Sequence, residues 1–396
     1  MATQQRSYDV VLFGATGFTG RLTAEYLAGR MASTRFKWAI AGRNRAKLDE
    51  IHRALVAIEP KAAAVAVLEA SVEAPDSLDA LARSTRVVIT TVGPYARYGE
   101  PLVSACARAG TDYVDLTGEP EFVDRMIERY DEEARKTGAR IVHCCGFDSI
   151  PHDLGAYFTV KQLPSDQPIV VEGFVRGGGQ FSGGTWASAL GAFADAGAYY
   201  KRRMAKRGKR AAGDGRKVRP APAKLRFDRE LGAWACPLPT IDPQIVIRSA
   251  RALPEYGPDF QYGHYAEVRS LATLAAGAVG IGTLVALAQI PPARRALEKL
   301  RPSGAGPTAE ERARAHFRVR FFGRAGDRRV VTEVRGGDPG YGETSKMLAE
   351  SALCLALDRK KLPERAGVLT TAVAMGDRLL ERLVAAGITF EVVSKS

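Results

Sequence analysis

Cysteine is scarce in this sequence and is not arranged in pairs. The chain of 396 residues has five cysteines, and none of them forms a C-x-x-C motif. The first residues, MATQQRSYD, contain no apolar signal segment. An odd number of scattered thiols without a secretory signal favours the reducing cytoplasm over an extracellular, disulfide-bonded protein.

Several catalytic patterns are missing as well. The sequence has no evident Ser-His-Asp arrangement, no cluster with the spacing of metal ligands, and no Tyr-x-x-x-Lys in the loops that follow its predicted strands. We therefore expect neither a serine hydrolase nor a short-chain dehydrogenase dyad, and we predict no metal site. Long repeats and acidic or Gln/Asn-rich tracts are also absent, which excludes repeat and low-complexity proteins.

The composition is that of a globular protein with more than one core. Hydrophobic residues make up 46% of the chain and charged residues 26%, which is ordinary for folded domains. Chains longer than about 250–300 residues usually divide into domains. We therefore expect two domains.

Glycine is concentrated in one turn near the start. The stretch VVLFGATGFTG, residues 10–20, has three glycines at spacing G-x-x-G-x-x-G directly after an apolar run. Residues 8–13 are predicted as a buried strand and 19–29 as a helix, so the glycines lie at a strand-to-helix turn. Such a turn offers N–H groups and the positive end of a helix dipole to a pyrophosphate. The predicted dinucleotide contacts here are Gly14, Thr16, Gly17, Phe18, Thr19 and Gly20.

The end of the second predicted strand, residues 37–41, indicates which dinucleotide is bound. In this kind of fold a carboxylate there binds the ribose of NAD, whereas a nearby arginine accommodates the 2′-phosphate of NADP. The sequence continues GRNR without an acid, and Arg43 offers a planar guanidinium to a phosphate. We predict NADP(H), bound in this loop by Arg43 and Asn44.

Predicted strands and helices alternate through about residue 144, which argues for an α/β fold with a doubly wound, Rossmann-type parallel sheet. In such sheets the ligand lies beyond the carboxyl ends of the strands. The loops at those ends begin at Val92, Thr117 and Gly146, and they read VGPYARYG, TGE and GFDSIPHD. All three are rich in groups that a site can use.

The strings GATGFTGR, AGRNRAKL, TTVGPYARYG, AGTDYVDLTGE and CGFDSIPHDLG together resemble the saccharopine dehydrogenase-like oxidoreductases. The resemblance spans the first half of the chain and resumes in DPGYGET at 338–344 and GVLTTAVAMGD at 367–377. Within that family the sequence is most similar to the bacterial trans-acting enoyl reductases. These work beside polyketide synthases that lack a reductase of their own and serve the synthesis of envelope glycolipids.

The resemblance implies an activity and a division into domains. The activity is NADPH-dependent reduction of a carbon–carbon double bond in an acyl or polyketide chain, which a carrier protein could hold. We expect the NADP-binding domain at 1–150, a second α+β substrate domain at 151–365, and a C-terminal segment at 366–396 that returns to the first domain.

Three loop residues are candidate catalytic groups. The nicotinamide is expected near Gly93 and Pro94, and a proton must follow the hydride onto the substrate. Tyr95, Tyr98, Asp148 and His152 could supply that proton, and the first three are the predicted catalytic residues. A purely structural role in ordering these loops is an equally open interpretation for each of them.

The second domain contains a strongly basic segment. Residues 201–226 hold twelve Lys and Arg against one acid, and so account for most of the formal net charge of +13. The segment is either a solvated loop or a contact for an anionic membrane face or an acidic carrier protein. Nucleic acid is not expected as a partner, because no aromatic residues interleave with the charges.

An uncharged stretch of twenty residues follows at 271–290. Its length permits a membrane span, although its Ala and Gly content keeps its hydrophobicity modest. We expect it to dip into one leaflet or to line an apolar substrate channel; the alternative is a buried core helix. With the basic segment, it predicts peripheral binding to the inner face of the plasma membrane.

Two other functions are consistent with these features. One is a saccharopine-type amino-acid dehydrogenase, for which Arg176, Arg248, Arg251 and Arg269 are candidate ligands of substrate carboxylates. The other is a non-catalytic, NADP-bound protein of lipid surfaces.

Overall fold

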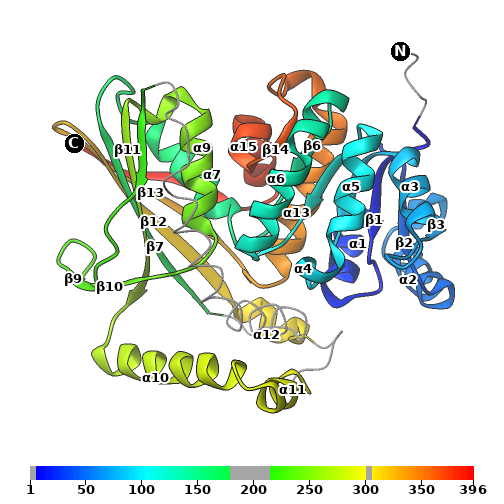
Figure 1. The fold of residues 1–396 in the computed structure, drawn as a ribbon, viewed down its shortest axis with the longest axis horizontal. Helices are drawn as coiled ribbons and strands as arrows, with labels where there is room; N and C mark the ends of the chain where they lie inside the picture. Colours follow the sequence, from blue (N-terminus) through cyan, green and yellow to red (C-terminus); the bar gives the residue numbers. More distant parts are fainter. Residues whose placement is uncertain (1–5, 179–214, 300–305) are drawn as a thin grey trace. The chain divides into compact units, whose positions relative to one another are not determined.

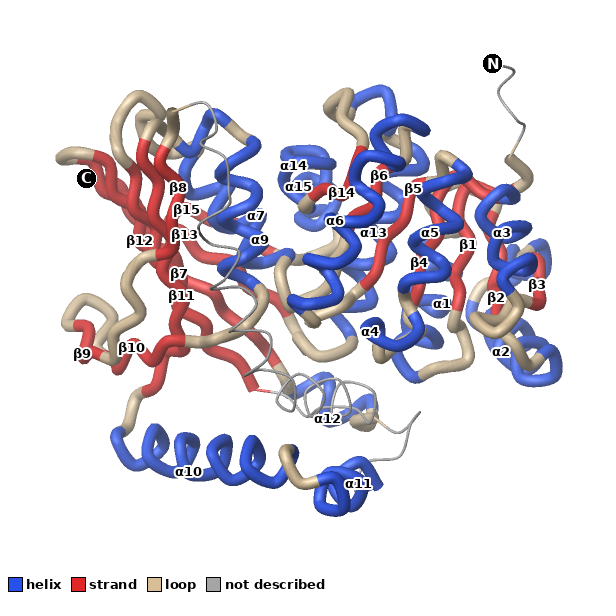
Figure 2. Tube along the Cα trace, viewed as in Figure 1, coloured by secondary structure: helices blue, strands red, loops and turns tan. Residues whose placement is uncertain are grey.

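A computed structural model describes residues 6–178, 215–299 and 306–396 and divides the chain into two compact units (Figure 1). The first unit comprises Met1–Ile150 and Gly337–Ile388, and the second comprises Pro151–Gly336 and Thr389–Ser396. Each unit contains its own sheet (Figure 2). The chain therefore passes between the two units more than once.

Seven parallel strands form the sheet of the first unit. Their order is β14-β6-β5-β4-β1-β2-β3, which is the Rossmann order extended by β14 at one edge. The apolar runs Val10–Leu12 and Val87–Ile89 are fully buried in its centre, as strands covered on both faces require. The predicted doubly wound parallel fold is confirmed. The strands are β1 (Tyr8–Phe13), β2 (Trp38–Gly42), β3 (Ala66–Glu69), β4 (Thr85–Thr90), β5 (Asp112–Asp115), β6 (Arg140–Val142) and β14 (Gly367–Leu369).

Helices cover both faces of this sheet. α3, α5 and α6 pack side by side on one face, while α1 and α13 pack together on the other (Figure 2). α6 buries Phe122, Val123 and Met126 along one side and ends at Gly138, which has the left-handed φ of 80° that favours glycine. The helices are α1 (Phe18–Arg30), α2 (Arg45–Ile58), α3 (Pro75–Ser84), α4 (Tyr95–Tyr98), α5 (Glu100–Ala109), α6 (Pro120–Thr137), α13 (Gly342–Leu357), α14 (Thr371–Ala374) and α15 (Gly376–Ala385), with short 3₁₀ turns η1 (Pro60–Ala64) and η4 (Arg359–Lys361).

An eight-stranded mixed sheet forms the second unit. Its order is β15-β13-β12-β7-β11-β10-β9, and β8 also pairs with β11. α7 packs on one face, where Gly155 leaves room for the ring of Phe321. The strands are β7 (Ile169–Gly178), β8 (Lys217–Pro220), β9 (Arg226–Asp228), β10 (Ala233–Pro237), β11 (Asp259–Val268), β12 (His316–Ala325), β13 (Arg328–Gly336) and β15 (Thr389–Lys395), and the helices are α7 (Ile150–Val160), α9 (Asp242–Ala252), α10 (Leu271–Ala288), α11 (Pro291–Lys299), α12 (Ala309–Arg314) and the 3₁₀ turn η3 (Pro254–Tyr256).

The C-terminal part divides differently from the expected boundary at 365. Residues 337–365 belong to the first unit, because α13 lies in its helical layer and Glu350 accepts a hydrogen bond from Tyr26 of α1 at 2.8 Å. Residues 389–396 belong to the second unit, because β15 pairs with β13. Between them, β14 pairs with β6 in the first sheet.

The uncharged stretch forms α10, which is largely exposed. Only 6% of it is buried, and its mean hydropathy of 2.0 makes it long and apolar enough to cross a membrane by length and composition alone. Val279 is 70% exposed and Leu271 is 58% exposed. The alternative of a buried core helix is therefore wrong. Residues 201–214 of the basic segment lie outside the described residues, and its last residues contribute to β8 and β9.

Candidate active site

The glycine turn is folded around the main-chain carbonyl of Gly14. Gly14 has a φ of 95°, a value that L side chains rarely adopt. Its carbonyl oxygen accepts hydrogen bonds from the Gly17 N–H at 3.1 Å and the Thr91 hydroxyl at 3.0 Å. Gly20 packs over the same oxygen, so that any Cβ at position 20 would overlap it. The turn is thereby held against the end of β4.

The N-terminus of α1 lies directly after this turn. Its N-cap residue, Gly17, has an extended backbone, and no side chain caps this end of the helix. An uncapped N-terminus offers main-chain N–H donors and the positive end of the helix dipole to an anion. A Cβ on Gly17 would make only an ordinary contact, 3.5 Å from the Gly14 carbonyl oxygen. The fold does not require glycine there, whereas close approach of a pyrophosphate does.

The other residues of the motif have separate surroundings. Thr16 is exposed at the turn. The ring of Phe18 packs edge-on against Tyr341, with centroids 5.0 Å apart. The carbonyl oxygen of Thr19 accepts a hydrogen bond from the Thr23 hydroxyl at 2.8 Å. Phe18 therefore fixes the start of α1 against the C-terminal segment of the same unit, and Thr16 and Thr19 stay candidate ligands.

The loop after β2 presents one arginine. Arg43 is exposed and has no ion-pair partner within residues 6–178, 215–299 and 306–396. Asn44 caps α2, since its side chain accepts a hydrogen bond from the Lys47 N–H at 3.0 Å. Arg45 pairs with Asp49 at 2.9 Å. Arg43 therefore stays the predicted partner of a 2′-phosphate, and Asn44 orders the turn beside it.

The loop after β4 is fixed by a carboxylate to which the sequence analysis gave no role. Gly93 and Pro94 lead into the short helix α4, and Glu119 caps that helix. The Glu119 carboxylate accepts hydrogen bonds from the main-chain N–H groups of Tyr95 at 3.0 Å and Ala96 at 2.7 Å. Glu119 follows β5, so this contact joins two of the three loops predicted to form the site.

The three predicted proton donors lie in different surroundings. Tyr95 is 4% exposed, and its hydroxyl donates to the last carbonyl oxygen of β4 at 3.0 Å. Burial raises the pKa of Tyr95 well above its usual value. Tyr98 is half-buried, with the guanidinium of Arg97 5.0 Å from its ring centroid. Asp148 is exposed. Tyr95 is therefore built into the loop, whereas Tyr98 and Asp148 are more accessible.

A second buried carboxylate, Asp115, holds the ends of β5 and β6. It accepts a hydrogen bond from the Tyr113 hydroxyl at 2.9 Å and lies 2.7 Å from Nδ1 of His143. The main-chain N–H groups of Thr117 and Cys144 also donate to it. The sequence alone does not predict this role, because a single acidic residue at the end of a short strand is common and indicates no particular contact.

The chain is similar in sequence to known proteins. Residues 10–142 match the family model described as the saccharopine dehydrogenase NADP binding domain. A Mycobacterium tuberculosis H37Rv protein, named provisionally as a trans-acting enoyl reductase, is 40% identical over 99% of both chains. The trans-acting enoyl reductase of Mycobacterium leprae is 35% identical over 98% of both chains. The chain belongs to the trans-acting enoyl reductase family.

This membership confirms the predicted family and its cofactor. The chain is an oxidoreductase with an NADP-binding domain of the saccharopine dehydrogenase type. Among solved structures, apo saccharopine dehydrogenase (L-Glu forming) from Saccharomyces cerevisiae has a TM-score of 0.55 at 14% identity and is covered over 99% of its length by 97% of this chain. That likeness shows a shared fold in both units.

Substitution of Arg43 tests the cofactor preference. Arg43→Asp should lower the affinity for NADPH by about 10- to 150-fold, because a charge-assisted phosphate contact of roughly 1.5–3 kcal/mol is lost. NADH should lose less, since aspartate can accept a hydrogen bond from the ribose. Fluorescence titration of both cofactors measures this, with Arg53→Asp on the exposed side of α2 as the charge-matched control. An unchanged NADPH preference in Arg43→Asp would show that another group binds the 2′-phosphate.

Substitution of two glycines of the turn should distinguish an effect on cofactor binding from an effect on folding. Gly17→Val should abolish binding of both dinucleotides while the thermal midpoint stays near that of the unmodified protein, because the side chain blocks pyrophosphate approach and its Cβ makes only an ordinary contact with the protein. Gly20→Ala should instead lower the midpoint, because its Cβ overlaps the Gly14 carbonyl. Calorimetric titration and circular dichroism measure the two effects. Normal cofactor affinity in folded Gly17→Val would contradict the assignment of this turn.

Proposed function

We propose that this chain is an NADPH-dependent enoyl reductase that acts in trans on an acyl or polyketide chain made by another enzyme. The proposal rests on the 35–40% identity to trans-acting enoyl reductases over 98–99% of the chain. Because that similarity includes the second unit, it goes beyond the dinucleotide-binding domain that many oxidoreductases have in common. By the same resemblance, the product serves the synthesis of envelope glycolipids.

The reaction needs a hydride and a proton. Bound NADPH supplies the hydride, which adds to the β-carbon of an α,β-unsaturated thioester, and the α-carbon then takes a proton. Tyr98 is our first candidate for the proton donor, because it follows the Gly93–Pro94 turn and is half-buried, whereas Tyr95 is buried. Asp148 is the second candidate.

The second sheet has an arginine-rich face that suits an anionic partner. The side chains of Glu267 and Glu333 are 2% and 1% exposed, and arginines of β7, β12 and β13 surround them. The excess positive charge favours an acidic carrier protein that brings the acyl chain. These arginines are Arg176, Arg318, Arg320 and Arg335, with Arg269 beside them.

The same contacts disfavour a saccharopine-type substrate. Arg176 and Arg269, two candidate ligands for substrate carboxylates, lie 3.5 and 3.8 Å from Glu267. Their charge is partly neutralised by a carboxylate of the protein itself. Binding the carboxylates of such a substrate at these arginines would require displacing that contact.

A turnover assay separates the three candidate functions. We expect the protein to oxidise NADPH when given a medium-chain enoyl thioester of N-acetylcysteamine or of an acyl carrier protein. It should not reduce NADP⁺ when given saccharopine. NADP⁺ reduction with saccharopine alone would favour the amino-acid dehydrogenase, and NADPH binding without turnover of either substrate would favour the non-catalytic protein.

Substitution of the two tyrosines tests the proton donor. Tyr98→Phe should lower kcat by about 10²- to 10⁴-fold with little change in NADPH affinity, because it removes a general acid. Tyr95→Phe, the matched control, should mainly lower thermal stability, since a hydrogen bond worth about 1 kcal/mol is lost. Steady-state rates and thermal melts give both readouts. Full activity in Tyr98→Phe would show that Tyr98 is not the proton donor and would favour Asp148 or solvent in that role.

We also propose that α10 and the basic segment together bind a lipid surface. One apolar element gives marginal attachment, and a polybasic segment of the same chain supplies a second signal. Val279→Asp should reduce co-sedimentation with anionic vesicles several-fold, whereas Val384→Asp on α15, at another exposed apolar position, should not. Binding should weaken at high salt, because the Debye length is about 10 Å at 0.1 M. Equal sedimentation of both variants would exclude α10 as the contact.

A further inference from the structure

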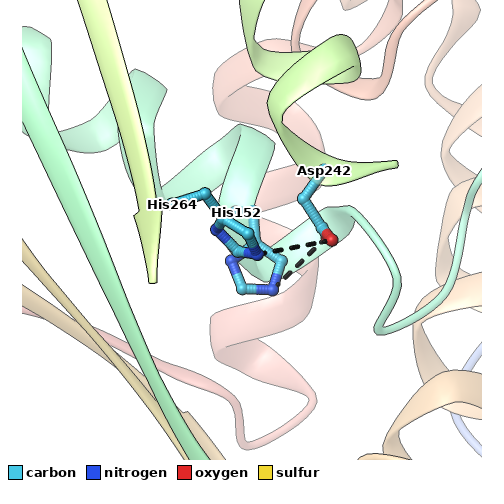
Figure 3. Close-up of side chains that lie close together, drawn as sticks. All are labelled: His152, Asp242 and His264. Carbon is cyan, nitrogen blue, oxygen red and sulfur yellow. Dashed lines mark ion pairs between the residues drawn. The ribbon is translucent and has the colours of Figure 1, made fainter. Parts of the chain in front are cut away.

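Three buried polar side chains meet in the second unit. His152 lies at the start of α7, Asp242 is the first residue of α9, and His264 lies on β11 (Figure 3). They are 2%, 3% and 7% exposed. Their nitrogen and oxygen ligand atoms all lie within 4.8 Å of one another. Residues distant in the sequence thus form a compact cluster, and no sequence motif with a regular spacing predicts it.

Two of the separations within the cluster are close to those of atoms around a common ion. Nε2 of His152 lies 3.4 Å from one oxygen of Asp242, and Nε2 of His264 lies 3.6 Å from the other. A charge-assisted hydrogen bond is shorter, at about 2.7–2.9 Å. The buried pair His143 and Asp115 of this chain shows that shorter distance, 2.7 Å. Ligands about 2.0–2.1 Å from a tetrahedral zinc ion lie roughly 3.3–3.4 Å apart.

The charges of the cluster also call for a cation. Asp242 stands in the first turn of α9, where the helix dipole favours the ionised carboxylate. Within the described residues, no Lys or Arg pairs with Asp242, and its Oδ1 accepts no hydrogen bond, although the Thr240 side chain and the Asp242 main-chain N–H donate to the carboxylate. A buried carboxylate left in this state is costly unless a cation joins it.

One imidazole is oriented as metal-binding histidines usually are. The hydroxyl of the buried Tyr262 lies 3.4 Å from Nδ1 of His264. A polar partner at that nitrogen holds the ring so that Nε2 faces Asp242. Both Nε2 atoms therefore face the same carboxylate.

We propose that His152, Asp242 and His264 form a binding site for a divalent transition-metal ion, with Zn²⁺ as the first candidate. Two imidazoles and one carboxylate, without a thiolate, are a ligand set that suits Zn²⁺ and its neighbours in the first row. The ion joins α7, α9 and β11, and so stabilises the second unit. This inference is independent of the substrate proposed above.

The test uses the full chain freed of metal with a chelator and then exposed to Zn²⁺. We expect one Zn²⁺ per chain after gel filtration and a rise in the thermal midpoint, because an ion that binds the folded state stabilises it by mass action. Asp242→Asn and His264→Gln should each lose the bound ion and the rise. His316→Gln, which removes an exposed histidine of β12, should keep both.

X-ray absorption at the zinc edge of the unmodified protein gives a readout that needs no variant. We expect nitrogen and oxygen neighbours near 2.0–2.1 Å with imidazole scattering and no sulfur. Absence of stoichiometric Zn²⁺ together with no change in the thermal midpoint would overturn the proposal. Sulfur ligands, or undiminished binding by folded Asp242→Asn, would place the ion elsewhere and overturn it as well.

Discussion

The close contact at the Gly14 carbonyl oxygen is the constraint on which the dinucleotide domain depends. One oxygen accepts hydrogen bonds from the turn and from the end of β4, and Gly20 packs over it without a side chain. This contact fixes where α1 begins relative to the central strands β1 and β4. Because α1 begins there, its uncapped N-terminus lies at the edge of the sheet where ligands bind in this fold.

Buried carboxylates give the same edge its rigidity. Glu119 holds the first turn of α4, and Asp115 holds the ends of β5 and β6. Both carboxylates accept hydrogen bonds from main-chain N–H groups that would otherwise lack a partner in the interior. The loops are therefore ordered by side chains of the protein itself. Of the three candidate proton donors, Tyr98 and Asp148 are the accessible ones.

The sequence predicted what depends on local pattern. The strand, glycine turn and helix at 8–30, the arginine after β2 and the alternation up to β6 all follow from neighbouring residues. Parts that depend on distant contacts were not predictable in this way. β14 has three residues and pairs only because the chain returns to β6. His152, Asp242 and His264 come from three separate elements, and nothing in their spacing indicates that they meet.

Transfer of deuterium from labelled NADPH tests the central claim most directly. The protein is given an enoyl thioester with NADPH deuterated at either face of C4, and the product is analysed by mass spectrometry. The account predicts that one labelled form places a single deuterium on the β-carbon and that reaction in D₂O with unlabelled NADPH places one on the α-carbon. Consumption of NADPH without deuterium in the thioester, or no consumption at all, would contradict it.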